Sequence, residues 1–234
     1  MIKSMSRVRR RPGTTREEFE RYWTTVHAPL VAPTIPGLRK YVLNVAFKPE
    51  DSDVEPDWDG VAELGFDDLD SMRAGMSAPT WLSDERQASS ERLLDMPTIL
   101  GMTVEQHVIL DSAPEPGKRF VKLLAFVHRQ PKMSHEQFAD YWVNVHAPLV
   151  KPRIPGLRKY ILNVAFQPPG SDTPPPCDGV VELAFDDLAS LRKGMSAPDW
   201  MSDDRQRSSE AFLDLGRNTS LYTEEYVVPL PGNR

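Results

Sequence analysis

The sequence is poor in the residues and segments that would suggest several common protein classes. Its single cysteine, Cys177, excludes an intramolecular disulfide and a multi-thiolate metal site. Its apolar runs fall far short of the roughly 20 residues that span a bilayer, and the start, MIKSMSRVRRRPG, has no apolar segment of signal-peptide length. The net charge of −6 gives no electrostatic reason to bind nucleic acid or an anionic membrane. We therefore expect a cytoplasmic protein whose partner is a small molecule or another protein.

Several enzyme signatures are also missing from the sequence. There is no Gly-rich phosphate loop and no G-x-S-x-G nucleophile elbow. No histidine pair has metal-ligand spacing, and acidic pairs such as Asp67 and Asp68 are expected to cap or solvate helices. The sequence thus predicts no metal site and no cofactor. Its 40% hydrophobic and 26% charged residues are typical of a folded soluble protein.

What the chain does contain is a long internal repeat. The segment YWTTVHAPLVAPTIPGLRKYVLNVAF at 22–47 returns as YWVNVHAPLVKPRIPGLRKYILNVAF at 141–166, and the same offset continues without a gap along both copies. A repeat of this length is a whole domain rather than a solenoid unit. We predict a tandem duplication with a first unit at 1–111, an exposed Pro- and Gly-containing linker at 112–118 and a second unit at 119–234.

Each copy alternates strand-like and helix-like patterns. In the first copy we expect strands near 2–10, 38–47, 60–66 and 103–110, one helix after the capping box Thr15-x-x-Glu18, and two shorter helices between the last two strands. The second copy has the matching capping box Ser134-x-x-Gln137. The order β-α-β-β-α-α-β is a split βαβ arrangement with helices on one face of an antiparallel sheet. Because the other face needs a cover, we predict an α+β fold in which two ferredoxin-like units pack as a barrel-like pseudo-dimer, with ligand space between sheet and helices.

The segments RRRPGTTREEFERYWTTVHAPL, IPGLRKYV and DGVAELGFDDL resemble the EthD family of the dimeric α/β-barrel superfamily. The resemblance covers nearly all of both copies, and YW-x3-HAPL is its most specific part. It implies ferredoxin-like units that pair into a barrel, but related barrels include polyketide cyclases, muconolactone-type isomerases, cofactor-free monooxygenases and heme-using enzymes, so it does not set the chemistry. Relatives of the isomerase type use a histidine and a tyrosine in the ligand pocket, which match His27 and Tyr41 in the first copy and His146 and Tyr160 in the second.

The residues themselves also favour His27 as a candidate acid or base. On a helix that turns about 100° per residue, Val26 lies about 20° from Phe19 and His27 about 80° from it. We therefore expect Val26 in the buried stripe and His27 at its edge, where an imidazole is partly desolvated and still reaches a cavity. The alternative is a histidine that only binds carbonyl groups at the end of the helix.

Three further residue types are candidates, each with a structural alternative. Glu63 stands in an apolar strand, where it either lines the cavity as a base or as an orienting partner for His27, or pairs with Lys or Arg across the interface between the two sheets for structural reasons. Trp23 precedes the histidine by one turn and is a ligand platform or a core residue, and Tyr41 is a proton donor or a packing residue. Asn44, on the other face of its strand from Tyr41, is a candidate substrate-binding residue. The second-copy candidates are Trp142, Tyr160, Asn163 and Glu182.

From these residues we expect a cofactor-independent enzyme of isomerase, cyclase or lyase type. Its substrate would be a small, largely apolar carbonyl compound, such as a lactone, an aromatic catabolite or a polyketide-like intermediate. The alternatives are a cofactor-free monooxygenase and a non-catalytic binding protein of a degradation pathway. Because the strand at 120–129 is more apolar than its counterpart at 2–10, we expect the two pockets to differ, with His146 the more active histidine. Further homo-oligomerisation of the whole chain is compatible with this hypothesis.

Overall fold

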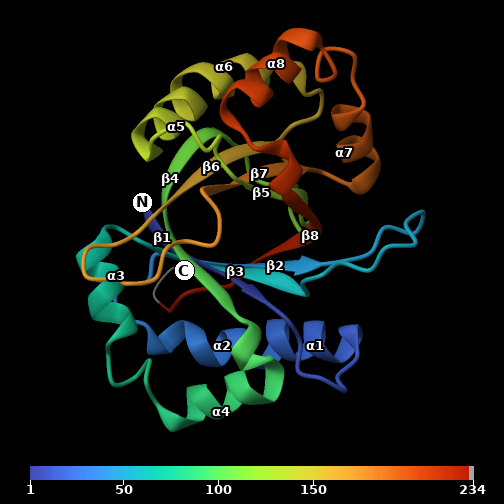
Figure 1. Cartoon of the computed structure of the whole chain (residues 1–234). Coiled ribbons are helices and arrows are strands. Elements are labelled where there is room, and N and C mark those ends of the chain that lie inside the picture. Colours follow the sequence, from blue (N-terminus) through green and yellow to red (C-terminus); the bar gives the residue numbers. More distant parts are fainter. Residues whose placement is uncertain (232–234) are drawn as a thin grey trace. The chain divides into compact units, whose positions relative to one another are not determined.

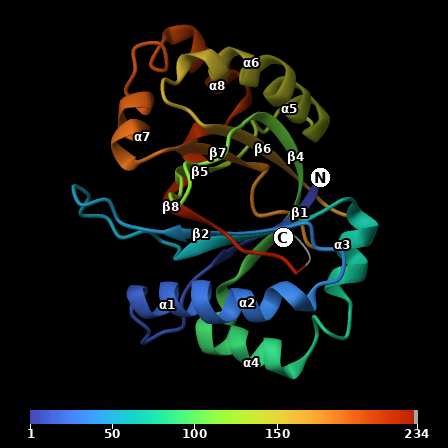
Figure 2. The same cartoon turned by 180° about the vertical axis from the view of Figure 1, so that it is seen from behind.

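The structure, a computed structural model, describes residues 1–231 and contains the same series of elements twice (Figures 1 and 2). The first copy comprises β1 (Ile2–Val8), α1 (Arg16–Tyr22), α2 (Ala28–Val31), β2 (Lys40–Ala46), β3 (Gly60–Phe66), α3 (Leu69–Met76), α4 (Asp84–Leu93) and β4 (Leu100–Asp111). The second comprises β5 (Val121–Val127), α5 (His135–Tyr141), α6 (Ala147–Val150), β6 (Lys159–Phe166), β7 (Gly179–Phe185), α7 (Leu188–Met195), α8 (Asp203–Phe212) and β8 (Thr219–Val227). No helix within residues 1–231 is long and apolar enough to cross a membrane.

The compact units of the structure are not identical to the two sequence copies. Unit 1 comprises Met1–Val104 and the segment that begins at Glu224, and unit 2 comprises Glu105–Thr223. The strands β4 and β8 therefore each begin in one unit and end in the other. The predicted linker at 112–118 has no helix or strand and lies within unit 2. Each unit is thus completed by a short strand segment that the other sequence copy supplies.

Within each unit, the third strand of the copy is the centre of an antiparallel sheet. In unit 1, β3 pairs with β1 and β2, with Met5 opposite Glu63 and Asn44 opposite Val61. In unit 2, β7 pairs in the same way with β5 and β6. The predicted fold class is confirmed: the chain is mixed α/β, with two repeated ferredoxin-like units and antiparallel strands.

The helix that carries the histidine is not a regular α-helix. A π-helical turn, Trp23–His27, lies between α1 and α2, and the backbone stays helical through all three. A π turn holds more residues than an α turn, so it shifts every later side chain around the axis. The large buried residues are therefore Phe19, Trp23, His27 and Val31, four apart, while Val26 is 46% exposed. The prediction that Val26 is buried was wrong, because it assumed a constant 3.6 residues per turn, and His27 is more deeply buried than predicted.

The start of this helix agrees with the sequence. Thr15 accepts a hydrogen bond from the backbone N–H of Glu18, and the Glu18 carboxylate accepts one from the backbone N–H of Thr15. Ser134 and Gln137 form the same capping box in unit 2. Both predicted capping boxes are confirmed, and they fix the residue at which each histidine-bearing helix begins.

Candidate functional site

A cavity of about 250 Å³ lies between the sheet and the helices of unit 1. The strands contribute Tyr41 and small or apolar side chains to one wall, and the π turn, α2, α3 and α4 contribute to the other. Three sequence-predicted residues, Trp23, His27 and Tyr41, meet here. The remaining lining residues are Ser4, Ser6, Val8, Val31, Ala62, Leu64, Met76, Trp81, Arg86, Ser90, Leu94, Met96 and Ile99.

His27 is the titratable group with the most distinctive surroundings in this cavity. Its side chain is buried, and its Nδ1 is hydrogen-bonded to the hydroxyl of Ser89 at 2.9 Å. The same hydroxyl lies 3.2 Å from the Tyr22 hydroxyl. Burial, helped by the positive charge of Arg86, lowers the pKa of His27 to about 4. The imidazole is therefore neutral at neutral pH, with Nδ1 occupied and Nε2 as the remaining nitrogen.

Tyr41 and Trp23 both line the cavity. Tyr41 is 3% exposed, and burial raises the pKa of its hydroxyl, so the phenol is neutral at neutral pH. Its hydroxyl is hydrogen-bonded to the Trp23 side chain. An indole N–H can only donate, so Trp23 donates to the tyrosine oxygen and leaves the Tyr41 proton for another acceptor. Trp23 itself packs on Gly60, where a Cβ atom would lie 2.5 Å from its ring.

Glu63 and Asn44 lie on the other face of the sheet and do not meet His27. Strand alternation places them on the face away from Tyr41, Ser4 and Ala62. The Glu63 carboxylate is paired with Lys3 at 2.6 Å and accepts a hydrogen bond from Asn44 at 2.6 Å, and all three side chains are buried. In unit 2, Glu182 is paired with Lys122 at 2.7 Å and accepts from Asn163 at 2.9 Å. A carboxylate compensated in this way fits a structural role for Glu63, but its cation comes from the neighbouring strand β1 of the same sheet and not, as predicted, from across the interface between the sheets.

The sequence did not point to the polar residues of α4, although three of them shape the cavity. Arg86 and Ser90 line it, and Ser89 holds His27. The helix DERQASSERL is so polar that its residues read as solvated. The signal that could have found them is the repeat, because Arg86, Ser89 and Ser90 return as Arg205, Ser208 and Ser209.

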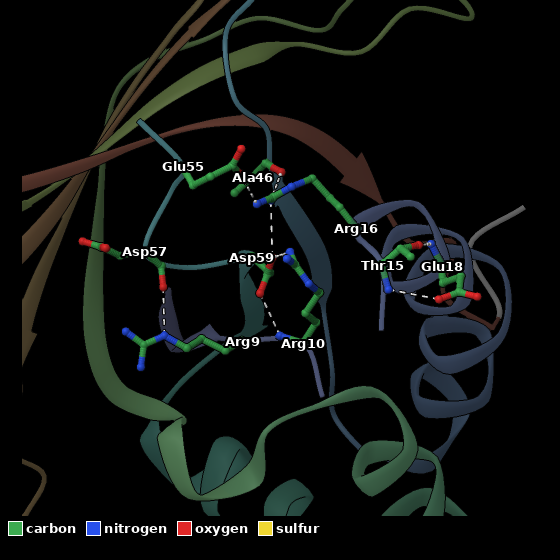
Figure 3. A network of polar contacts seen from close by, with 9 residues as sticks. All are labelled: Arg9, Arg10, Thr15, Arg16, Glu18, Ala46, Glu55, Asp57 and Asp59. Carbon is green, nitrogen blue, oxygen red and sulfur yellow. Dashed lines mark hydrogen bonds and ion pairs between the residues drawn. The ribbon is translucent and has the colours of Figure 1, made fainter. Parts of the chain in front are cut away.

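A polar network fixes the histidine-bearing helix to the loop between β2 and β3 (Figure 3). Asp59 accepts from the backbone N–H of Arg10 at 2.8 Å and forms ion pairs with the guanidinium groups of Arg10 and Arg16. Arg16, the first residue of α1, also donates to the carbonyl of Ala46 at 3.0 Å. These contacts join β1, β2 and α1 near the start of the helix. They hold the helix axis, and so Trp23 and His27, in position over the sheet.

Unit 2 repeats this framework with larger side chains at several cavity positions. His146 is hydrogen-bonded to Ser208 at 2.9 Å, and burial, helped by Arg205, lowers its pKa to about 4. The positions of Ser4 and Ala62 are taken by the larger Leu123 and Val181, and the position of Ser6 by the apolar Ala125; all three pack against the core of the unit. Phe212, at the position of Leu93, lies with its ring 4.8 Å from that of His146. Tyr160 and Trp142 are as buried as their unit 1 counterparts.

Within residues 1–231, no group of three or more His, Cys, Asp or Glu side chains is placed to hold a metal ion. Cys177 is buried, and its thiol donates to the carbonyl of Gly179 at 3.4 Å.

The EthD domain matches the chain twice, at residues 11–95 and 130–216. The chain belongs to the EthD family. It is a tandem duplication of that domain, as predicted. A search of curated proteins gives no match.

Solved structures share the fold over the full length of the chain. An anthrone oxidase-like protein is 11% identical with a TM-score of 0.65, over 97% of this chain and 93% of its own. A candidate monooxygenase from Fusobacterium nucleatum is 9% identical with a TM-score of 0.61, over 97% of this chain and 92% of its own. Another, from Lactobacillus acidophilus, is 11% identical with a TM-score of 0.56, over 97% and 95%. At these identities the likeness shows the fold alone.

Proposed function

We propose that this EthD-family chain is a cofactor-independent enzyme that transfers a proton on a small, largely apolar carbonyl compound, and that unit 1 holds the working site. The observation that carries the proposal is the cavity in which a neutral imidazole and a neutral phenol face apolar walls. The names of the structural neighbours, an anthrone oxidase-like protein and candidate monooxygenases, support small-molecule chemistry in this fold.

In this proposal His27 is the proton-transferring group. The hydrogen bond between its Nδ1 and the Ser89 hydroxyl fixes the ring. The proposal assigns the tautomer in which Nδ1 carries the proton and donates to Ser89, so that the lone pair of Nε2 accepts a substrate proton. The π turn turns this imidazole towards the sheet, where an α turn would leave it at the edge of the buried face.

Tyr41 binds the carbonyl oxygen of the substrate in the same proposal. Its proton is not used by Trp23, and its neutral state at neutral pH keeps it a donor. A hydrogen bond to the carbonyl oxygen stabilises the negative charge that develops there when a neighbouring C–H proton leaves. Isomerisation and cyclisation both proceed through such a step.

We propose His27, rather than His146, as the main catalytic residue, which differs from the sequence-based expectation. That expectation rested on the more apolar β5 and its power to exclude water. In the structure, Leu123 of β5 and Val181 of β7 pack against the core of unit 2, while the smaller Ser4 and Ala62 at the matching positions line a cavity in unit 1.

The test is proton exchange, which needs no knowledge of the natural substrate. The protein is incubated in D₂O with a panel of lactones, cyclic ketones and β-keto esters, and loss of the α-proton signals is followed by NMR. We expect exchange above the buffer rate for at least one compound. His27→Gln should lower that rate by about 10² to 10⁴, and His146→Gln, the matched control, should change it less than threefold.

Two outcomes contradict the proposal. If wild-type protein accelerates exchange for no compound while binding some of them, the chain is a binding protein. If His27→Gln keeps the full rate with unchanged thermal stability, proton transfer by this histidine is excluded.

A further inference from the structure

Arg86 differs from the other residues of the unit 1 cavity, because hydrogen bonds fix its guanidinium while some of its N–H donors have no acceptor in residues 1–231. Its Nε donates to the carbonyl of Trp81 at 2.7 Å, and its Nη1 donates to the hydroxyl of Ser90 at 3.3 Å. The guanidinium carbon lies 4.3 Å from the centre of the Trp81 ring. Among residues 1–231, none accepts a hydrogen bond from Nη2 of Arg86. Hydrogen bonds therefore hold one side of the planar guanidinium in place, and the N–H groups of Nη2 are available to a ligand.

The charge of Arg86 also lacks a carboxylate partner. No Asp or Glu within residues 1–231 forms an ion pair with it. Its counterpart Arg205 makes the same contacts, to the carbonyl of Trp200 at 2.7 Å and to Ser209 at 3.3 Å. Burial lowers the pKa of Arg205, and the negative charges of Asp204 and Glu210 raise it. For Arg86, burial is the one cause within the described part of the chain that shifts the pKa, and it lowers the pKa. The two units thus share a scaffold but differ in charge balance.

The rest of the cavity is suited to an apolar body. Its walls include Trp23, Val31, Leu64, Met76, Leu94 and Ile99. A volume of about 250 Å³ is the room of roughly eight waters at about 30 Å³ each, which corresponds to a compound of one or two rings. Arg86 is the only cation among the lining residues.

We propose that Arg86 is the anion-binding group of the His27 cavity, so that the compound bound there carries a negatively charged oxygen at one end of a small apolar body. The chemistry that fits is a carboxylate or an ionised phenol or enol, held by the free edge of the guanidinium. This proposal rests on the cavity being the site of the proposed function and adds the class of its substrate.

An anionic substrate also makes the proposed chemistry easier. The Arg86 charge is one of the two causes that lower the pKa of His27. A bound anion offsets this charge and raises the pKa of His27 towards its ordinary value, which strengthens the base. His27 Nε2 then takes the proton from a carbon beside the carbonyl, the C–H electron pair moves into an enolate, and the imidazolium returns the proton to another carbon. No other reactant is consumed.

The test is the affinity of matched anionic and neutral probes, measured by calorimetry at pH 7.5. One pair is 1-naphthoate and 1-naphthamide, and the other is 2,4-dinitrophenolate and 2,4-dinitroanisole. We expect at least tenfold tighter binding of the anion in at least one pair, and the pair that shows it tells a carboxylate from an ionised phenol. Arg86→Met should reduce this preference to less than twofold while the affinity for the neutral probe is unchanged.

Matched variants guard against a general effect of the substitution. Arg205→Met should keep the full preference, and Arg86→Lys, which keeps the charge but loses the fork, should keep part of it. If Arg86→Met fails to fold, Arg86→Gln replaces it. If Arg86 is only a solvated surface arginine, wild type should show no preference for the anion. That result overturns the proposal. So does absence of binding in both pairs, or an equal loss of preference in Arg86→Met and Arg205→Met.

The result is separable from the proton-transfer proposal. His27→Gln should keep the preference for the anion, because His27 is not the group that binds it. If wild type prefers the anion but catalyses no proton exchange, the anion-binding proposal stands and the proton-transfer proposal is wrong.

Discussion

The two units share the same framework but differ in the side chains that line the unit 1 cavity and in those at the matching positions of unit 2. Both contain the capping box, the π turn, the histidine bonded to a serine, and the buried Lys-Glu-Asn group. At the cavity positions, however, unit 1 has Ser4 and Ala62 where unit 2 has the larger Leu123 and Val181. We infer that the shared residues maintain the fold, and we propose that a few changes of side-chain volume determine which unit has room for a ligand.

The largest effect is expected when the two copies are separated. A chain of residues 1–117 lacks the end of β8, which belongs to unit 1, and carries the end of β4, which belongs to unit 2. Each half should therefore expose strand edges and apolar surface, and should aggregate or remain unfolded until the two are mixed. Size-exclusion chromatography and circular dichroism check this. Two stable, monomeric halves would show that the shared strands are not needed.

The buried ion pairs should be equally important in both units. Lys3→Met and Lys122→Met each leave a buried carboxylate without its cation, which we expect to lower the free energy of unfolding by about 3 to 5 kcal/mol. The double variant Lys3→Met/Glu63→Gln should recover part of the loss, because the charge is removed while the amide still bonds Asn44. Urea denaturation gives the values. A loss below about 1 kcal/mol in either unit would argue against this structural role.

The two histidines should make stability depend on pH in the same way. Each has a native pKa of about 4 and an unfolded value near 6.5, so between these values the unfolded chain binds more protons than the native one. Their contribution is complete above pH 6.5 and is lost as the pH falls to about 4, by about 3 kcal/mol each. His27→Gln/His146→Gln should flatten this part of the curve. An unchanged slope in the double variant would mean that neither histidine is held neutral.

The cavity walls should be exchangeable between the units, with the smallest effect on energy. Ser4→Leu/Ala62→Val gives unit 1 the residues of unit 2, and we expect about a tenfold loss of probe affinity, or about 1.4 kcal/mol. The reciprocal Leu123→Ser/Val181→Ala should leave binding to unit 1 unchanged. Calorimetry with 1-naphthoate measures both. Equal affinity in all three proteins would place the probe elsewhere.

Much of the fold could be predicted because its signals are local. The repeat gave two like units, Thr15 and Ser134 marked helix starts through their own hydrogen bonds, and strand alternation put Tyr41 and Asn44 on opposite faces. The exchange of strand ends between units could not be predicted. The sequence pattern of β4 predicts a strand but does not indicate that its second half belongs to unit 2.

The candidate site could be predicted only in part, for two physical reasons. The π turn changes the phase of the helix, so a regular wheel placed Val26 inside and His27 at the edge. Arg86 and Ser89 lie on a polar helix, where hydrophobic periodicity gives no sign that a serine hydroxyl turns inwards to bind an imidazole. The cation that pairs with Glu63 could not be predicted either, because only the pairing of β1 with β3 brings Lys3 beside it.

The most direct test of the account is a crystal structure of the protein with a carbonyl compound that exchanges its α-proton in the NMR assay. The account predicts density for the compound in the unit 1 cavity, with its carbonyl oxygen at hydrogen-bond distance from the Tyr41 hydroxyl and the exchanging carbon facing Nε2 of His27. The compound bound beside His146 instead, or on the sheet face of Glu63, would contradict the assignment of the site to His27.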